Sequence, residues 1–308
     1  MIDIRPTFKE ILLGNLKRLS YIQDLVSILF LYHSKFSNPI SVIMKNKHKK
    51  YPIIAKLKDK DTKIIENFGK LLSVLYDFDY DHKKDIVSLN KLNYNIKLFS
   101  AIGNGEIIGV FYKKDYGFLD VKDKTVIDIG ANIADSSIYF ALEGASSVIA
   151  LEPYAKNYDI ARHNIDLNNL SSKIILIQSG CSSKEENLKV DSDYSGVFKP
   201  LLQSKNGKTI KLMTLQSIME RFHIETAILK MDCEGCEYDV ILNAPKNILK
   251  KFSQIQIEYH YGYEPLKTTL SEIGFEVSVT TPRFRFNKFA EKKDMYVGWL
   301  YAKYIQKF

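Results

Sequence analysis

From Lys124 to the end of the chain, short apolar runs alternate with segments whose apolar residues recur at helical spacing. The apolar runs predict strands at residues 125–129, 147–151, 173–178, 227–231, 254–259, 275–280 and 295–302. Strands that alternate with helices are typical of a mostly parallel α/β sheet with helices on both faces. Residues 282–294 have no helical pattern, so we expect the last two strands to form a hairpin in which one strand is antiparallel.

The first part of the chain has a different pattern and predicts an α+β extension. Helical spacing over residues 7–35 predicts a helix, which Asn38-Pro39 ends because proline disfavours helix at the residue before it. Strands are predicted at residues 40–44, 51–57, 94–101 and 106–112, and a helix at residues 61–76. We therefore place a boundary near Asp120, with an extension over residues 1–119 and a second domain over residues 120–308.

The composition is that of a folded protein, with 45% hydrophobic and 26% charged residues in a chain of 308. No run reaches the roughly 18 to 20 apolar residues of a membrane span, and Gln23 and Asp24 interrupt the most apolar helical segment, residues 19–32. The first residues also lack the pattern of a secretory signal. We expect a cytoplasmic protein without stable membrane insertion, and the oligomeric state stays open.

The formal net charge of +8 would favour an anionic partner, but the basic residues are dispersed along the chain. The densest cluster lies between Lys45 and Lys50. We interpret it as a solvated hairpin tip, because a nucleic-acid footprint needs several such groups on one face.

The strongest chemical signal follows the strand predicted at residues 125–129, in the segment Asp128-Ile-Gly130-Ala-Asn132. Gly130 lets the backbone approach a ligand without a β-carbon in the way, and the helix after it offers free N–H groups to an anion. Glu152 ends the next strand, about 24 residues beyond Asp128, where an acid can accept both hydroxyls of a ribose. Together these features predict an adenosine-bearing ligand. The G-x-G-x-x-G fingerprint of nicotinamide dehydrogenases is absent, and an acid at 128 suits a cationic amino group better than a pyrophosphate.

Four motifs in combination resemble the FkbM family of S-adenosylmethionine-dependent methyltransferases, over roughly Asp120 to Gly274. They are Asp128-Ile-Gly-Ala-Asn132, Ala150-Leu-Glu152-Pro153, Asn164 with Asn168, and Leu229-Lys230-Met-Asp232-Cys-Glu234-Gly235-Cys-Glu237. The resemblance implies a Rossmann-like class I sheet of seven strands with one antiparallel strand. It also implies S-adenosylmethionine as cofactor and methylation, usually of an oxygen of a small molecule, sugar or lipid-linked glycan.

The sequence departs from the family pattern at three places. Ala134 stands where glycine is usual, Gln216 stands where aspartate is usual, and cysteines occupy both variable positions of the acidic motif. None of these changes removes a group that we expect to be essential. The predicted cofactor-binding residues are Asp128, Gly130, Ala131, Asn132, Glu152, Pro153 and Ser179.

The predicted catalytic residues are Asp232, Glu234 and His260. They follow two strands that we expect to be neighbours, so they should meet at the carboxyl edge of the sheet, where open α/β folds bind ligands. We expect Glu234 or His260 to accept the proton of the methyl acceptor. Lys230 lies in an apolar strand and should pair with a neighbouring acid, since an unpaired buried ammonium is costly.

The three cysteines suggest neither a disulfide framework nor a zinc site. A closed zinc site needs further ligands beside Cys233 and Cys236, and Cys181 is the remaining cysteine, so we predict no metal and treat the pair as packing residues. A weak magnesium site at the acidic rim stays open.

Two other functions compete with methylation of a small molecule or carbohydrate. Positive charge and aromatic residues such as Tyr112 and Tyr116 could serve an RNA or DNA methyltransferase, but the N/D-P-P-Y/F sequence associated with amine methylation is absent. The second competing function is that of a binding module without catalysis. The acids at 128, 152, 232 and 234 are intact, which argues against this alternative. The acceptor is not identified, because its pocket would lie in the extension and in the polar insertion at residues 182–208, which we predict to be a loop or small hairpin.

Overall fold

A computed structural model describes residues 18–90, 94–103, 105–190, 208–286 and 294–305. The chain divides into two compact units, with the division near Gly103. Residues 105–119 belong to the same unit as residues 120–305, although the sequence pattern placed them in the extension.

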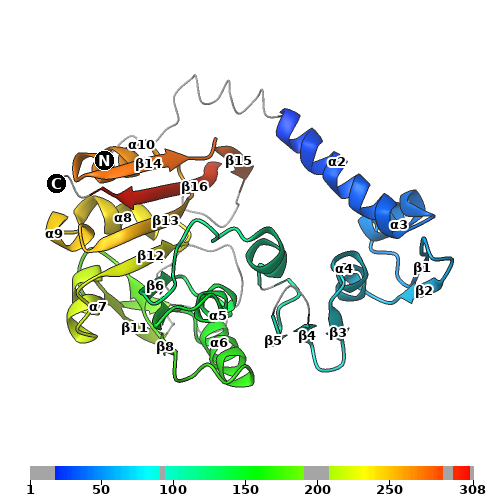
Figure 1. Ribbon diagram of the computed structural model, residues 1–308, viewed down its shortest axis with the longest axis horizontal. Coiled ribbons are helices and arrows are strands. Elements are labelled where there is room, and N and C mark those ends of the chain that lie inside the picture. Colours follow the sequence, from blue (N-terminus) through cyan, green and yellow to red (C-terminus); the bar gives the residue numbers. More distant parts are fainter. Residues whose placement is uncertain (1–17, 91–93, 104, 191–207, 287–293, 306–308) are drawn as a thin grey trace. The chain divides into compact units, whose positions relative to one another are not determined.

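The second unit is built on a sheet with the strand order β14–β16–β13–β12–β6–β7–β8, and β15 pairs with β16 (Figure 1). Only β16 runs antiparallel to its neighbours β13 and β14 along this path, and the other pairs are parallel. This confirms the predicted α/β sheet with one antiparallel strand. The strands are β6 (Thr125–Ile129), β7 (Ser147–Leu151), β8 (Ile174–Ile177), β12 (Ala227–Met231), β13 (Phe252–Tyr259), β14 (Phe275–Val279), β15 (Arg283–Phe286) and β16 (Asp294–Tyr304).

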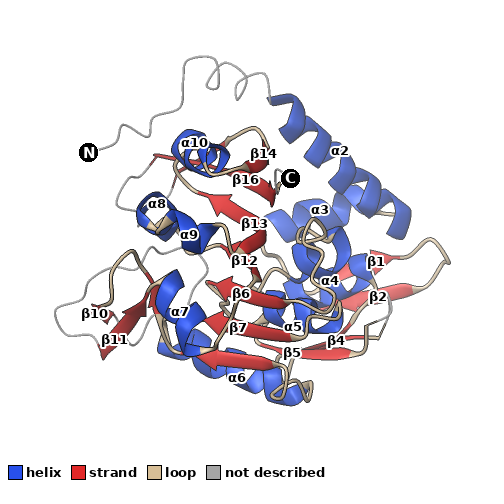
Figure 2. Ribbon diagram, turned by 60° about the vertical axis from the view of Figure 1, so that its left-hand side comes forward, coloured by secondary structure: helices blue, strands red, loops and turns tan. Residues whose placement is uncertain are grey.

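Helices flank this sheet and bury its central strands on both faces, which explains their near-continuous apolar sequences (Figure 2). All five residues of β12 are buried, as are four of the five in β6. Helix α5 packs against β6, β7 and β8, and α10 packs against β14 and α8. The helices are α5 (Asp135–Leu142), α6 (Ala155–Leu167), α7 (Leu215–Arg221), α8 (Cys236–Asn243), α9 (Lys246–Leu249) and α10 (Glu264–Glu272).

A small second sheet stands beside the ends of the central strands. It has the order β10 (Glu186–Val190), β11 (Lys208–Met213) and β9 (Gly180–Cys181), and β10 pairs with β11 antiparallel. The predicted hairpin in the polar insertion is thereby confirmed for its described residues, and residues 191–207 lie outside them. Ser183 donates hydrogen bonds to Asp239 through its N (2.7 Å) and its Oγ (2.8 Å), which joins the insertion to helix α8.

The first unit has its own core and an α+β composition. Phe36, Val42, Ile53 and Leu71 are fully buried in that core. Its elements are α2 (Arg18–Lys35), α3 (Pro39–Lys47), β1 (Ile53–Lys56), β2 (Thr62–Ile65), α4 (Phe68–Tyr76), β3 (Asp79–Asp81), β4 (Ile86–Leu89) and β5 (Ile96–Phe99). Residues 7–17 of the predicted N-terminal helix lie outside the described residues. No helix in the described ranges has the length and apolar character needed to cross a bilayer.

Three predicted elements in the first 119 residues were wrong. Residues 40–44 belong to helix α3 because Pro39 sits in its first turn, where a missing N–H costs nothing, and the basic cluster is therefore at the end of a helix. Residues 61–76 form strand β2 and then helix α4, which starts where the Asn67 side chain accepts the Lys70 N–H. Residues 106–112 form no strand, since Ile108–Lys113 is a helix of π type.

Candidate active site

A cavity of about 270 Å³ lies where the carboxyl ends of β6, β7 and β12 meet. This is the edge at which open α/β sheets bind their ligands. The predicted site residues that line it are Gly130, Asn132, Glu152, Pro153, Ser179, Asp232 and Glu234. The predicted residues Asp128, Ala131 and His260 are buried behind its wall.

The turn after β6 can form only because residue 130 is glycine. Gly130 has φ of +79°, and a β-carbon there would lie 1.8 Å from the carbonyl oxygen of Asp232. The N–H groups of Gly130 and Ala131 both donate to the Leu151 carbonyl, at 3.0 and 2.9 Å. The ends of three strands are therefore held against one another around one residue without a side chain.

Glu152 connects the turns that follow β6 and β7. Its carboxylate accepts the N–H of Asn132 at 2.9 Å and the N–H of Tyr154 at 3.0 Å, and the residue is 3% exposed. Burial raises the pKa of Glu152 to about 8, because desolvation disfavours the charged form more than these hydrogen bonds favour it. The carboxylate stands in the cavity wall, where a ligand with hydroxyl donors would favour its ionised form.

Asp128 faces the protein interior and binds a lysine. One of its oxygens lies 2.9 Å from Lys230 Nζ, and the other accepts hydrogen bonds from the Ser136 and Ser137 hydroxyls at 2.7 and 2.6 Å. Lys230 also donates to the Gly130 carbonyl at 2.8 Å. The expected pairing of Lys230 with an acid is confirmed. Asp128 thus supports the glycine turn from behind, through the lysine.

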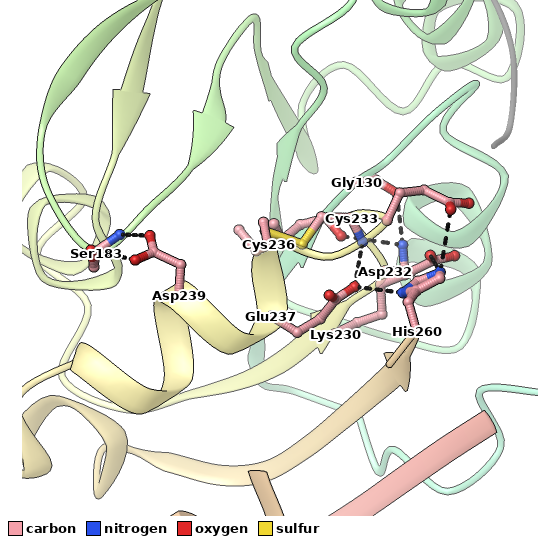
Figure 3. The surroundings of a disulfide bond; sticks show 11 residues. Gly130, Ser183, Lys230, Asp232, Cys233, Cys236, Glu237, Asp239 and His260 are labelled. Carbon is pink, nitrogen blue, oxygen red and sulfur yellow. Dashed lines mark hydrogen bonds and ion pairs between the residues drawn. A yellow bond between two sulfur atoms is a disulfide. The ribbon is translucent and has the colours of Figure 1, made fainter. Parts of the chain in front are cut away.

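Three acids surround one buried histidine, and Figure 3 shows two of them, Asp232 and Glu237, beside His260. His260 Nδ1 lies 3.0 Å from Glu237 Oε1, and His260 Nε2 lies 3.5 Å from Glu234 Oε2 and 3.8 Å from Asp232 Oδ1. Burial by itself would lower the pKa of His260, but the carboxylates, Glu237 first, outweigh it and raise the pKa to about 10. The three predicted catalytic residues are therefore brought together in space.

Glu258 is a further acid of this cluster. Burial raises its pKa well above the ordinary value, and the charge of Asp232, to which it is hydrogen-bonded, acts in the same direction. A protonated Glu258 can donate a hydrogen bond to the Asp232 carboxylate.

Cys233 and Cys236 form a disulfide, which corrects the prediction that they are packing residues. Their Cα atoms are 5.5 Å apart, a distance that a disulfide bridges readily. The bond closes the turn that carries Glu234, whose φ is +57°. The signal was the C-x-x-C spacing at the start of a helix, since α8 begins at Cys236.

The sequence analysis assigned no cofactor or catalytic residue to the segment before β6, and it named Tyr116 only as an aromatic residue that could serve a nucleic-acid methyltransferase. Glu106, Val110 and Tyr116 line the cavity, and Tyr116 is buried with its ring 5.7 Å from Lys230 Nζ. The segment was assigned to a strand of the extension, so its place at the site had no sequence signal.

The residues present suit an adenosine-bearing cofactor. The glycine turn leaves a cradle that a β-carbon would fill, and the Glu152 carboxylate stands in the wall beside it with two acceptor oxygens. Asp232 and Glu234 of the acidic cluster line the same cavity as this turn.

Residues 128–277 match the family model of the methyltransferase FkbM domain. A protein of Sulfolobus islandicus rod-shaped virus 1, called uncharacterized protein 158B, is 29% identical to this chain over 145 residues. The matched residues cover 47% of this chain and 66% of the viral protein, which is just under two thirds of its length. A candidate transferase from Pyrococcus horikoshii is 15% identical with a TM-score of 0.41, covering 72% of this chain and 73% of that one. An O-methyltransferase from Bacillus cereus, solved in complex with SAH, is 13% identical with a TM-score of 0.35, covering 59% and 74%.

Proposed function

We propose that this chain, whose residues 128–277 match the methyltransferase FkbM domain, is an S-adenosylmethionine-dependent methyltransferase that methylates a hydroxyl oxygen of a small molecule, sugar or glycan. The observation that carries the proposal is the cluster of Asp232, Glu234 and His260 at the cavity that also contains the Gly130 turn. A hydroxyl must lose its proton as it is methylated, and a carboxylate at this place can take that proton.

The cofactor residues have distinct roles in this proposal. Glu152 accepts the ribose hydroxyls, while the backbone of Gly130, Ala131 and Asn132 forms the floor on which the cofactor lies. Pro153 and Ser179 complete the wall of the cavity, and Asp128 acts from behind by fixing Lys230. S-adenosylmethionine supplies an electrophilic methyl group on a sulfonium.

Glu234 is the proposed proton acceptor. It lines the cavity, whereas His260 is buried behind it and lies between Glu234 and Glu237. Glu234 takes the proton of the acceptor hydroxyl while that oxygen forms its bond to the methyl carbon, and the electron pair of the broken carbon–sulfur bond stays on sulfur. His260 Nε2, which lies 3.5 Å from Glu234 Oε2, holds the Glu234 carboxylate in place.

The test is methyl transfer from isotopically labelled S-adenosylmethionine to a panel of hydroxylated small molecules and saccharides. Glu234→Gln should slow turnover by roughly 100- to 10,000-fold while the affinity for S-adenosylhomocysteine stays nearly unchanged. Glu225→Gln, at an exposed position outside the site, is the matched control and should turn over normally. Wild-type turnover by Glu234→Gln would remove Glu234 from the reaction, and labelling of RNA in place of hydroxylated compounds would favour the nucleic-acid alternative.

We also propose that the protein is cytoplasmic. The redox state of the Cys233–Cys236 disulfide tests this location. Cytoplasmic disulfides are usually reduced or redox-active, because glutathione and thioredoxin keep thiols reduced there. Alkylation of thiols in intact cells before lysis should label Cys233 and Cys236 if the protein is cytoplasmic. Protection of both cysteines would point to an oxidising compartment.

A further inference from the structure

The acidic cluster has the donor atoms of a cation site. Asp232, Glu234 and His260 each offer one ligand atom, and these three atoms lie within 4.8 Å of one another. Ligands about 2.0 to 2.2 Å from a common divalent ion are about 3.0 to 3.6 Å apart. His260 Nε2 is already 3.5 and 3.8 Å from the two carboxylate oxygens, and those two side chains are partly exposed, so small rotations can bring them inward.

The buried histidine is aimed into this cluster without a hydrogen-bond partner. His260 is fully buried, and in the described part of the chain no atom within hydrogen-bond geometry satisfies its Nε2. The distances of 3.5 and 3.8 Å exceed the 2.7 to 3.2 Å of an ordinary N–H···O bond. A buried polar nitrogen without a partner costs free energy, which a bound cation at this point would recover.

The other ring nitrogen of His260 has the partner that metal-binding histidines usually have. Nδ1 lies 3.0 Å from Glu237 Oε1, and that carboxylate is itself fixed by the N–H of Cys233 at 3.1 Å. A carboxylate that accepts the Nδ1 proton orients the ring, and a cation that binds at Nε2 displaces the proton on that nitrogen. Glu237 is fully buried, so this arrangement is rigid.

Charge favours a cation at the same point. Asp232, Glu234 and Glu237 bring three carboxylates to one imidazole. The nearby ammonium of Lys230 is held by Asp128 at 2.9 Å. A divalent ion would offset the excess of negative charge.

We propose that Asp232, Glu234 and His260 Nε2 bind a divalent cation, with Glu237 as the outer partner of the histidine. Mixed imidazole and carboxylate ligands suit a transition ion such as Mn²⁺. Three protein ligands leave positions open for an acceptor oxygen, and a hydroxyl bound to a divalent ion loses its proton more easily. The activation of an acceptor hydroxyl by the cation rests on the proposed function. The substrate class would then be a compound whose hydroxyl can bind the metal ion. Glu234 binds the cation through one oxygen and takes the proton of the acceptor hydroxyl on the other.

The test measures Mn²⁺ binding to chelator-stripped protein by electron paramagnetic resonance and by isothermal titration, without any methyl acceptor. We expect one Mn²⁺ per chain, and a loss of affinity of more than about tenfold in Glu234→Gln and in His260→Gln. Glu237→Gln should weaken binding by roughly 10- to 100-fold, as removal of an outer carboxylate does elsewhere. Glu225→Gln, which removes one carboxylate charge at an exposed position outside the site, is the control and should leave Mn²⁺ affinity unchanged.

Circular dichroism of each variant checks folding, and Glu234→Gln keeps the test valid if the buried His260→Gln does not fold. Absence of Mn²⁺ binding at millimolar concentration, or equal loss of affinity in Glu225→Gln and Glu234→Gln, would overturn the cation site. Titration of S-adenosylhomocysteine into the same stripped protein separates the two proposals. Cofactor binding without Mn²⁺ binding rejects the cation alone, and Mn²⁺ binding without cofactor binding rejects the methyltransferase role alone.

Discussion

Protonation of Glu152 should control the affinity for the cofactor. Burial raises the pKa of this carboxyl to about 8, so at pH 7 about one molecule in eleven carries the ionised form. Ribose hydroxyls donate hydrogen bonds that favour the ionised form, and binding therefore has to release the proton. We expect affinity for S-adenosylhomocysteine to rise about tenfold between pH 7 and pH 8.5, and by a further factor of about ten if the comparison starts at pH 6.

The assay is isothermal titration at pH 6.0, 7.0, 8.0 and 8.5, in pairs of buffers with different ionisation enthalpies. Near pH 7 the difference between two buffers should report the release of roughly one proton. Glu152→Gln cannot titrate and should bind with an affinity that changes far less with pH, which controls for protonation of the ligand. At pH 8.5, Glu152→Ala should lose about 1.5 to 3 kcal/mol of binding free energy.

The pH dependence of folding should have the opposite sign. The pKa of Glu152 in the folded protein is above its ordinary value of 4.5, so the folded state binds more protons than the unfolded state between these two values. The contribution of this group to stability is therefore complete below pH 4.5 and is lost as pH rises through about 8.

For the cofactor, a wild-type affinity for S-adenosylhomocysteine that is flat from pH 6 to pH 8.5 would refute the assignment of Glu152 to the ribose.

Two further predictions concern the backbone around the site. Ala134 has φ of +66°, a left-handed conformation that strains an alanine by about 1 kcal/mol. Ala134→Gly relieves this strain but loses a buried methyl group of similar value. We therefore expect the free energy of unfolding in urea to change by less than about 0.5 kcal/mol. The control Ala131→Gly, also buried, should cost about 1 kcal/mol, and equal losses would contradict the reasoning. Reduction of Cys233–Cys236 should lower the free energy of unfolding by about 2 kcal/mol, whereas the double serine variant should not respond to reductant.

Much of the second unit could be predicted because its strands are buried on both faces. Residues 125–129, 147–151 and 227–231 read as mainly apolar runs, which Asp128 and Lys230 interrupt, and the structure has strands at those positions. The first unit has smaller elements, and there an apolar run of five residues such as 40–44 fits a helix turn as well as a strand. Proline at position 39 was taken as the end of one helix, whereas it also begins the next.

The site could be predicted only where a residue follows a central strand. Gly130, Glu152 and Asp232 line the cavity as expected, because the carboxyl ends of parallel strands share one edge. Side-chain direction cannot be taken from position along the strand, and for this reason the inward turn of Asp128 toward Lys230 was not foreseen. Glu106 reaches the cavity from a segment without any motif.

The segment from Asp232 to Glu237 joins the cofactor turn to the acidic cluster, and this limits which variants can separate the two. The Asp232 carbonyl fills the space beside Gly130, the disulfide closes the turn around Glu234, and Glu237 fixes His260. A backbone shift anywhere in this segment therefore moves the cofactor turn and the acids together. Changes that keep the backbone in place are the ones that can distinguish cofactor binding from chemistry. Glu152→Gln acts on the ribose side of the cavity, and Glu234→Gln acts on the acceptor side. If Glu152→Gln changes mainly the cofactor affinity and Glu234→Gln changes mainly the turnover, the cavity is divided between cofactor and acceptor at Gly130.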